Sequence, residues 1–170
     1  MKENDDWYPE RPPEYAEPGQ FEAWILGSDR PPGLGEQGPS IAAFAVRRVG
    51  EENFCIGVAQ SKSTSEEYRA YVAAAVGSLE VLAPHSKIRI YSHHETIVRA
   101  VNEWMPGWQK RGWRNAKDER VAAAEIYQRY WDVKESRSIE DSATYVRKSD
   151  PRFAHIFAAL KSTIDKSISR

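Results

Sequence analysis

The chain has 170 residues, of which 24 are Lys or Arg and 25 are Asp or Glu, so its formal net charge is −1. This length fits one domain, and a hydrophobic content of 41% supports a packed core, which excludes a wholly disordered chain. The near-neutral total also excludes a basic field over the whole molecule, so any site for a polyanion must be a local patch.

The N-terminal segment is rich in proline and in acidic side chains, with six acidic residues against two basic ones in residues 1–20. Such a composition disfavours helix and sheet, so we expect an extended arm over residues 1–20 and a domain over residues 21–168. Two uses of this arm stay open. It is a disordered tail, or it docks on a protein partner through Trp7, Tyr8 and Tyr15.

Three apolar, β-rich runs follow the arm and predict three antiparallel strands. The first run, residues 21–28, ends at a loop crowded with Gly and Pro, and the next two, residues 40–49 and 53–61, have hairpin spacing. Cys55 is the only cysteine, so no internal disulfide forms and we expect a buried, inert thiol.

No apolar stretch approaches the length of a membrane span, and the N-terminus has no apolar signal-peptide core. We therefore expect a soluble protein of the cytoplasm or another reducing intracellular compartment, with no membrane partner.

The rest of the chain alternates between helical and strand patterns of apolar residues. The predicted elements are a helix over residues 65–83, a strand over 87–92, helices over about 95–104 and 119–133, a strand over 142–148, and a closing helix that begins at Pro151. Residues 105–117 are too rich in glycine and charge to predict a core element. Strands first and strand–helix alternation afterwards predict an α/β fold with a mixed sheet flanked by helices.

A basic segment over about residues 104–117 contains four basic side chains, no acidic one, and three of the six tryptophans. Cations beside aromatic faces suit contact with a nucleic-acid backbone and stacking on bases. The alternative, a solvated protrusion whose tryptophans pack the local core, stays open. The candidate nucleic-acid-binding residues are Trp104, Trp108, Lys110, Arg111, Trp113, Arg114 and Lys117.

The same segment resembles the basic handle of the type 1 ribonuclease H family, whose members cut the RNA strand of RNA–DNA hybrids. The family pattern is a Trp, a second Trp four residues on, and Lys or Arg residues around a Gly-Trp pair. Trp104, Trp108, Gly112 and Trp113 stand at these places.

The resemblance covers about residues 21–160, with supporting matches over residues 35–50 and 69–82. It implies a ribonuclease H-like fold with a five-stranded mixed sheet, in which three antiparallel strands are followed by parallel additions.

Family members hydrolyse RNA with two divalent cations held by four carboxylates, since such hard ions prefer oxygen ligands. This sequence departs from the family at all four positions, which carry Leu26, Tyr71, His93 or His94, and Ala154 or His155. Asp29 follows the first position by three residues, and Glu67 precedes the second by one helical turn. The resemblance thus implies a degenerate catalytic site.

Three hypotheses follow from the sequence. The first is a catalytically inactive ribonuclease H-like domain that serves as a nucleic-acid-binding or scaffold module and needs no cofactor. The second is a divergent, active ribonuclease H in which Asp29, Glu67 and either His93 or His94 hold Mg²⁺ or Mn²⁺, with Asp29 as the metal-ligand candidate. The third is a subunit that binds only protein, through its N-terminal arm. A structural role for the adjacent histidines is the alternative to metal binding, because neighbouring side chains diverge.

Overall fold

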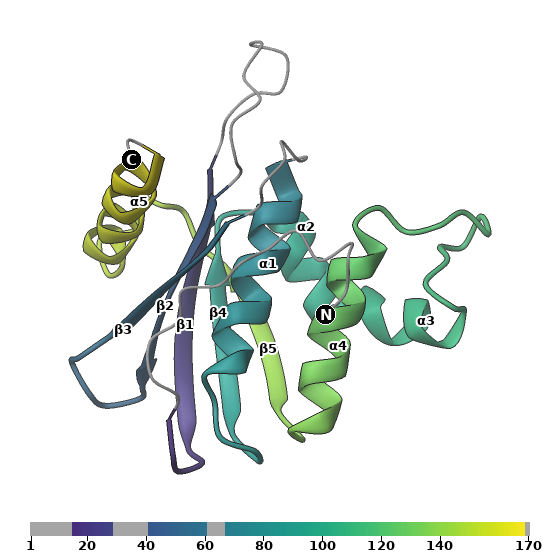
Figure 1. Cartoon of the computed structure of the whole chain (residues 1–170), viewed down its shortest axis with the longest axis horizontal. Coiled ribbons are helices and arrows are strands. Elements are labelled where there is room, and N and C mark those ends of the chain that lie inside the picture. The colour runs from purple at the N-terminus through teal and green to yellow at the C-terminus, as the bar shows by residue number, and fades with distance from the viewer. Residues whose placement is uncertain (1–14, 29–40, 61–66, 169–170) are drawn as a thin grey trace.

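The computed structural model describes residues 15–28, 41–60 and 67–168, and it contains a five-stranded sheet in the order β3-β2-β1-β4-β5 (Figure 1). The strands are β1 (Gln20–Gly27), β2 (Ile41–Arg48), β3 (Cys55–Gln60), β4 (Lys87–Ser92) and β5 (Glu140–Tyr145). Strands β1, β2 and β3 pair antiparallel, whereas β4 is parallel to β1 and β5 is parallel to β4. This confirms the predicted mixed sheet of three antiparallel strands followed by parallel additions.

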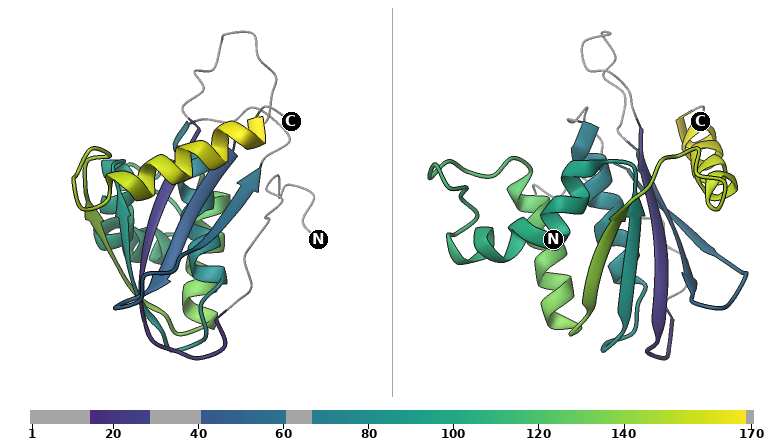
Figure 2. Two further views of the ribbon diagram at one scale, coloured as in Figure 1. Left: turned by 90° about the vertical axis from the view of Figure 1, so that its left-hand side faces the viewer. Right: turned by 180° about the vertical axis from the view of Figure 1, so that it is seen from behind.

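Helices lie on both faces of the sheet. They are α1 (Glu67–Glu80), α2 (Glu95–Arg99), the π-helical turn η1 (Ala100–Trp104), α3 (Met105–Lys110), α4 (Ala124–Ser136) and α5 (Ala154–Ile168). Helix α1 packs on β1 and β2 with α4 beside it, and α5 crosses the opposite face (Figure 2). Burial from both sides explains why the runs 23–28 and 41–46 are continuously buried rather than alternating. None of the helices described has the length and apolarity needed to cross a bilayer.

The helical segment that follows β4 is longer than the sequence predicts. The predicted helix over about 95–104 continues through η1 into α3 and ends at Lys110. Met105 is buried at the junction, and Pro106, which has no N–H to donate, follows the π-helical turn η1 at the start of α3. The prediction that residues 105–117 form no core element is therefore wrong for their first turns.

The predicted helix over about 119–133 begins only at Ala124. Ala123 has a left-handed backbone with φ of 60°, and the Val121 N–H donates to the Trp113 carbonyl at 3.0 Å. These residues close a loop onto Trp113 instead of starting the helix.

The last strand, β5, is shifted from the predicted 142–148, because pairing with β4 sets its ends.

The end of the predicted arm packs against the domain. The Tyr15 ring lies 4.7 Å from the Phe21 ring, its N–H donates to the Val81 carbonyl at 2.8 Å, and its hydroxyl donates to the Val46 carbonyl at 3.3 Å. Tyr15 thus anchors this chain's own fold, and β1 begins at Gln20, inside the predicted arm. Residues 1–14, with Trp7 and Tyr8, lie outside the described part.

Candidate functional site

The carboxyl ends of β1, β4 and β5 lie at one edge of the sheet, because these three strands run parallel. Helix α1 approaches this edge closely at Gly27. A Cβ atom on Gly27 would lie 2.9 Å from Cβ of Ala70 and 3.0 Å from Cδ2 of Tyr71. The absence of a side chain at Gly27 therefore allows α1 to bring Tyr71 against the end of β1.

Tyr71 pairs with the histidines that follow β4. Its side chain is fully buried, and its hydroxyl lies 2.7 Å from Nε2 of His93. The Tyr71 ring is 5.3 Å from the His93 ring and 4.7 Å from the His94 ring. Leu26, at the end of β1, is 4% exposed. The rings of Tyr71, His93 and His94 therefore occupy the space between the strand ends and α1.

The four positions at which the family carries carboxylates do not fit a pair of divalent cations. Leu26 offers no ligand atom, and Tyr71 already shares its hydroxyl with His93. On α5, Ala154 is half-buried and His155 is exposed, and neither carries a carboxylate. Hard cations such as Mg²⁺ need several oxygen ligands. Within the described ranges, no group of three or more His, Cys, Asp and Glu side chains could hold a metal ion.

Two of the carboxylates considered as substitutes are not placed by the structure. Asp29 lies outside the described residues. Glu67 begins α1, and only its backbone is described. For the second hypothesis, the structure thus places His93 and His94 beside Tyr71. The side chains of Asp29 and Glu67 are not described, so their role as metal ligands stays a prediction.

The tryptophans of the handle, residues 104–117, pack inward to different extents. Trp104 and Trp108 are half-buried with ring centroids 5.6 Å apart, and Trp108 meets Tyr127 of α4 edge-on at 5.2 Å. Trp113 is buried and lies 6.4 Å from the ring of Trp131. These contacts fix the handle to α4 and leave Trp113 little surface for a base. Trp104 and Trp108 keep partial exposure.

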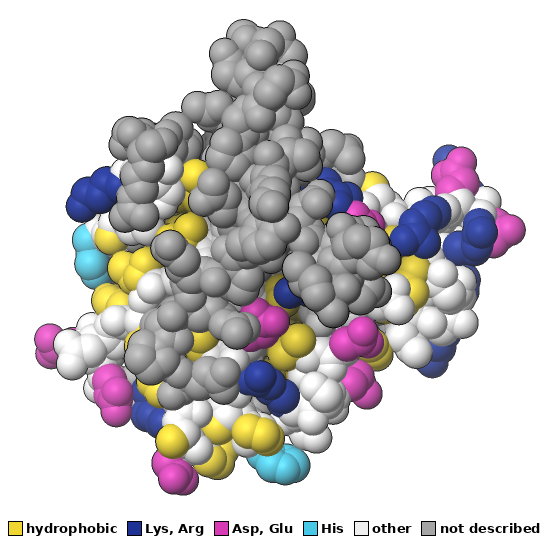
Figure 3. All heavy atoms as spheres, in the orientation of Figure 1, with side chains coloured by type: hydrophobic (Ala, Val, Ile, Leu, Met, Phe, Trp, Pro, Cys, Tyr) yellow, Lys and Arg dark blue, Asp and Glu magenta, His cyan; other side chains and the backbone are white. Residues whose placement is uncertain are grey.

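The basic side chains of the handle point into solvent. Exposed members are Lys110, Arg111, Arg114 and Lys117, together with Arg120, which lies just beyond the predicted segment. Figure 3 shows Lys and Arg side chains gathered on this projection, with acidic side chains among them. Arg114 is 3.9 Å from Asp118, so part of the local charge is offset. Arg120 is missing from the residues predicted from the sequence, because its position opposite Arg114 depends on how the loop turns.

The loop that carries these charges has its own hydrogen bonds. Oδ1 of Asn115 accepts the N–H groups of Lys117 at 2.9 Å and Glu119 at 3.0 Å. Arg114 and Arg120 form an antiparallel bridge across the loop. A polyanion would therefore meet cations on an ordered projection, which lowers the entropy cost of binding.

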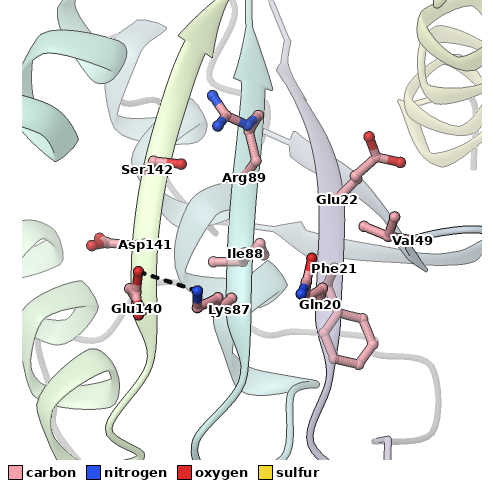
Figure 4. Close-up of a pocket in the computed structure, with 10 residues that line it drawn as sticks. All are labelled: Gln20, Phe21, Glu22, Val49, Lys87, Ile88, Arg89, Glu140, Asp141 and Ser142. Carbon is pink, nitrogen blue, oxygen red and sulfur yellow. Dashed lines mark ion pairs between the residues drawn. The ribbon is translucent and has the colours of Figure 1, made fainter.

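A groove of about 310 Å³ lies on the sheet face over β1, β4 and β5 (Figure 4). Within the groove, Nζ of Lys87 lies 3.7 Å from Oε2 of Glu140. Arg89 of β4 and Glu22 of β1, which lie opposite each other in the paired strands, also line it. Cations and carboxylates alternate across this groove, so it has no single sign of charge. It does not resemble a site for a polyanion.

No protein-family model matches the chain. Among curated proteins, it is 30% identical over 107 residues to the ribonuclease H of Xanthomonas campestris pv. campestris (strain 8004), which covers 63% of this chain and 69% of the relative. It is also 30% identical over 127 residues to the ribonuclease H of Acidiphilium cryptum (strain JF-5), which covers 74% of each.

Solved structures share the fold. LC9-RNase H1, a type 1 RNase H with the type 2 active-site motif, superposes with a TM-score of 0.64 at 11% identity, covering 92% of this chain and 75% of that one. The foamy viral protease-reverse transcriptase, solved with an RNA/DNA hybrid, gives a TM-score of 0.59 at 14% identity, covering 83% of this chain and 19% of that one. From the extent of the sequence match and the shared sheet topology, this chain belongs to the ribonuclease H family.

Proposed function

We propose that this chain is a catalytically inactive ribonuclease H-like domain that binds nucleic acid through its basic handle. The observation that carries the proposal is the hydrogen bond between buried Tyr71 and half-buried His93, whose hydroxyl and Nε2 atoms lie 2.7 Å apart where the family's metal-binding carboxylates would stand. An apolar side chain, Leu26, occupies the neighbouring strand end. Such a centre binds no pair of hard cations and so activates no water for hydrolysis.

Nucleic acid is the ligand class that the handle supports best. Its exposed cations sit on an ordered loop, and a structural neighbour of this chain was solved with an RNA/DNA hybrid. Arg99 lies 5.1 Å from the Trp104 ring at the root of the handle, but its charge is offset by Glu103 at 3.5 Å. Phosphate contacts of this kind bind without base specificity and weaken as salt rises.

Substitution of Lys110 and Arg111 together tests this binding. We expect Lys110→Ala with Arg111→Ala to weaken the affinity for an RNA–DNA hybrid and to reduce its salt dependence by about one unit of slope per lost phosphate contact. Fluorescence anisotropy of a labelled hybrid at several salt concentrations measures both. Lys161→Ala, an exposed cation on α5, is the matched control. Unchanged affinity in the double variant would contradict binding through the handle and favour the protein-binding subunit.

The second candidate is an active, divergent ribonuclease H, and the names of the curated relatives favour it. In that case Asp29, Glu67 and a histidine after β4 would hold Mg²⁺ or Mn²⁺. Purified protein incubated with hybrid and either ion distinguishes the two candidates. Cleavage that Asp29→Asn or Glu67→Gln abolishes would establish this activity and reject the inactive domain.

A protein partner for the N-terminal arm is a further part of the proposal. Tyr15 packs within the domain, so the side chains left for a partner are those of residues 1–14, with Trp7 and Tyr8 as anchors. Cys55 is half-buried, so the prediction of a buried thiol is wrong. A single cysteine in the sequence supports a reducing intracellular compartment.

A further inference from the structure

The connection from β5 to α5 follows the carboxyl ends of the parallel strands (Figure 2). Its side chains line a pocket of about 360 Å³. It is lined by residues 145–147 and 149–152. This connection is separate in sequence from the handle. Its charge and its exposed aromatic side chain set it apart from the mixed-charge groove.

Positive charge dominates this connection. Residues 145–152 contain three basic side chains and one acidic side chain, and Arg147 and Lys148 are exposed. Arg152 is held by Asp150, with its Nη2 and Nε atoms 3.0 and 3.2 Å from the carboxylate oxygens. The single carboxylate of this connection therefore pairs with Arg152, while the guanidinium of Arg147 is exposed.

Tyr145 presents an exposed aromatic ring beside these cations. It is 51% exposed, and few large apolar side chains in the described part are as open to solvent. Exposed aromatic rings next to cations are the elements that bind single-stranded nucleic acid, because bases stack on the ring while cations contact phosphates.

The position of Tyr145 links it to the handle. Strand alternation puts Tyr145 on the same face as Ala143, whose N–H and carbonyl both bond to the Asn102 side chain at 2.9 Å. Asn102 belongs to η1, which leads directly into α3 of the handle. Tyr145 thus lies two residues along β5 from the point where the helical segment that leads into the handle meets the sheet edge.

We propose that Tyr145 and Arg147 form a second nucleic-acid contact, specific for an unpaired strand, in which a base stacks on Tyr145 and Arg147 contacts a phosphate. This inference rests on the proposed nucleic-acid-binding function and extends it to a second surface. An unpaired base is required because both faces of a base within a duplex are already stacked.

Binding of a short, labelled poly(dT) oligonucleotide tests this contact, with anisotropy as the readout. We expect Tyr145→Ala to weaken binding about tenfold, since loss of one stacked base has an effect of this order. Tyr145→Phe keeps the ring and is expected to bind as the wild type does. Arg147→Ala should weaken binding and lower the salt slope by about 0.7, the value for one single-strand phosphate contact.

Lys87→Ala is the matched control, because Lys87 is an exposed cation at the opposite end of the parallel strands. Wild-type affinity in both Tyr145→Ala and Arg147→Ala, or no oligonucleotide binding by the wild type, would overturn the inference. Failure of the handle proposal has a different signature, which is full hybrid affinity after substitution of Lys110 and Arg111.

Discussion

Tyr71 determines which chemical groups lie between the end of β1 and helix α1. Its ring fills the space beside Gly27, and its hydroxyl is shared with His93 at 2.7 Å. A tyrosine in this position contributes packing and a hydrogen bond to stability, where a carboxylate would contribute a metal ligand. The substitution therefore links the proposed loss of catalysis to a gain in core packing.

Removal of the Tyr71 hydroxyl tests this structural role. We expect Tyr71→Phe to lower the free energy of unfolding by about 1 kcal/mol, because the ring stays packed while one buried hydrogen bond is lost. Chemical denaturation measures the change. Tyr145→Phe, which alters an exposed tyrosine, is the control and should unfold at the wild-type midpoint. Equal midpoints for all three proteins would mean that the bond to His93 contributes nothing.

Asp141 is a second residue whose environment has a measurable consequence. Its carboxylate accepts the Tyr130 hydroxyl at 2.6 Å and lies 3.6 Å from Nζ of Lys134. Burial raises the pKa of Asp141, and the contacts with Tyr130 and Lys134 oppose this only in part. The folded protein therefore binds the Asp141 proton more tightly than the unfolded chain does. The proton on Asp141 therefore stabilises the folded state fully at acid pH, and this stabilisation is lost as pH rises through the folded-state pKa.

Asp141→Asn removes this titration and keeps an acceptor for the Tyr130 hydroxyl. We expect the stability of the variant, relative to the wild type, to increase as pH rises from about 3 to about 7, the range over which a raised carboxyl pKa acts. Denaturation at a series of pH values gives the difference. A difference that stays constant with pH would show that Asp141 titrates alike in the folded and unfolded states.

At the scale of elements, the π-helical turn η1 supports the open edge of the sheet. Among the strands that the structure describes, β5 pairs only with β4, and the Asn102 side chain of η1 donates to and accepts from the Ala143 backbone, each at 2.9 Å. This amide takes the place of a neighbouring strand at that position. A side chain that pairs with an edge strand also covers part of the backbone at which another chain could add a strand.

Loss of this contact has a predictable cost. We expect Asn102→Ala to lower the free energy of unfolding by about 1–3 kcal/mol, because two backbone groups of Ala143 lose their partner. Asn102→Asp keeps the acceptor for the Ala143 N–H and should fall between the variant and the wild type. Thermal melting of the three proteins measures the order. An Asn102→Ala protein that melts with the wild type would contradict the bracing role.

The sheet could be predicted from the sequence because its strands carry continuous or alternating apolar runs, such as residues 21–28 and 87–92. Helix ends were less predictable. Met105–Lys110 is helical because η1 already supplies its first turn, and Ala124 begins a helix only because the preceding loop closes on Trp113. Such ends depend on contacts distant in sequence.

For the candidate site, only the residue types at its positions could be predicted from the sequence. The sequence alone places Leu26, Tyr71 and the two histidines at the family's carboxylate positions. The bond between Tyr71 and His93 could not be predicted, because it depends on how closely α1 approaches β1 at Gly27. The burial of Trp113 likewise follows from its left-handed backbone, with φ of 66°, which a sequence pattern does not reveal.

At the scale of the whole molecule, a net charge of −1 results from opposed local charges. The handle and the connection from β5 to α5 are basic, the groove over β1, β4 and β5 is mixed, and the first twenty residues are acidic. Local patches of this kind attract a polyanion over a Debye length of about 8 Å at physiological salt, so the near-neutral total does not prevent binding.

Binding without cleavage is tested by following one labelled RNA–DNA hybrid in both reactions. Protein is added until the hybrid is saturated, Mg²⁺ or Mn²⁺ is supplied, and the RNA strand is examined on a denaturing gel. We expect the hybrid to be bound through the handle and to stay intact, and Lys110→Ala with Arg111→Ala should reduce the bound fraction. A cut RNA strand, with cleavage lost in Asp29→Asn or Glu67→Gln, would rule out an inactive domain and establish an active ribonuclease H.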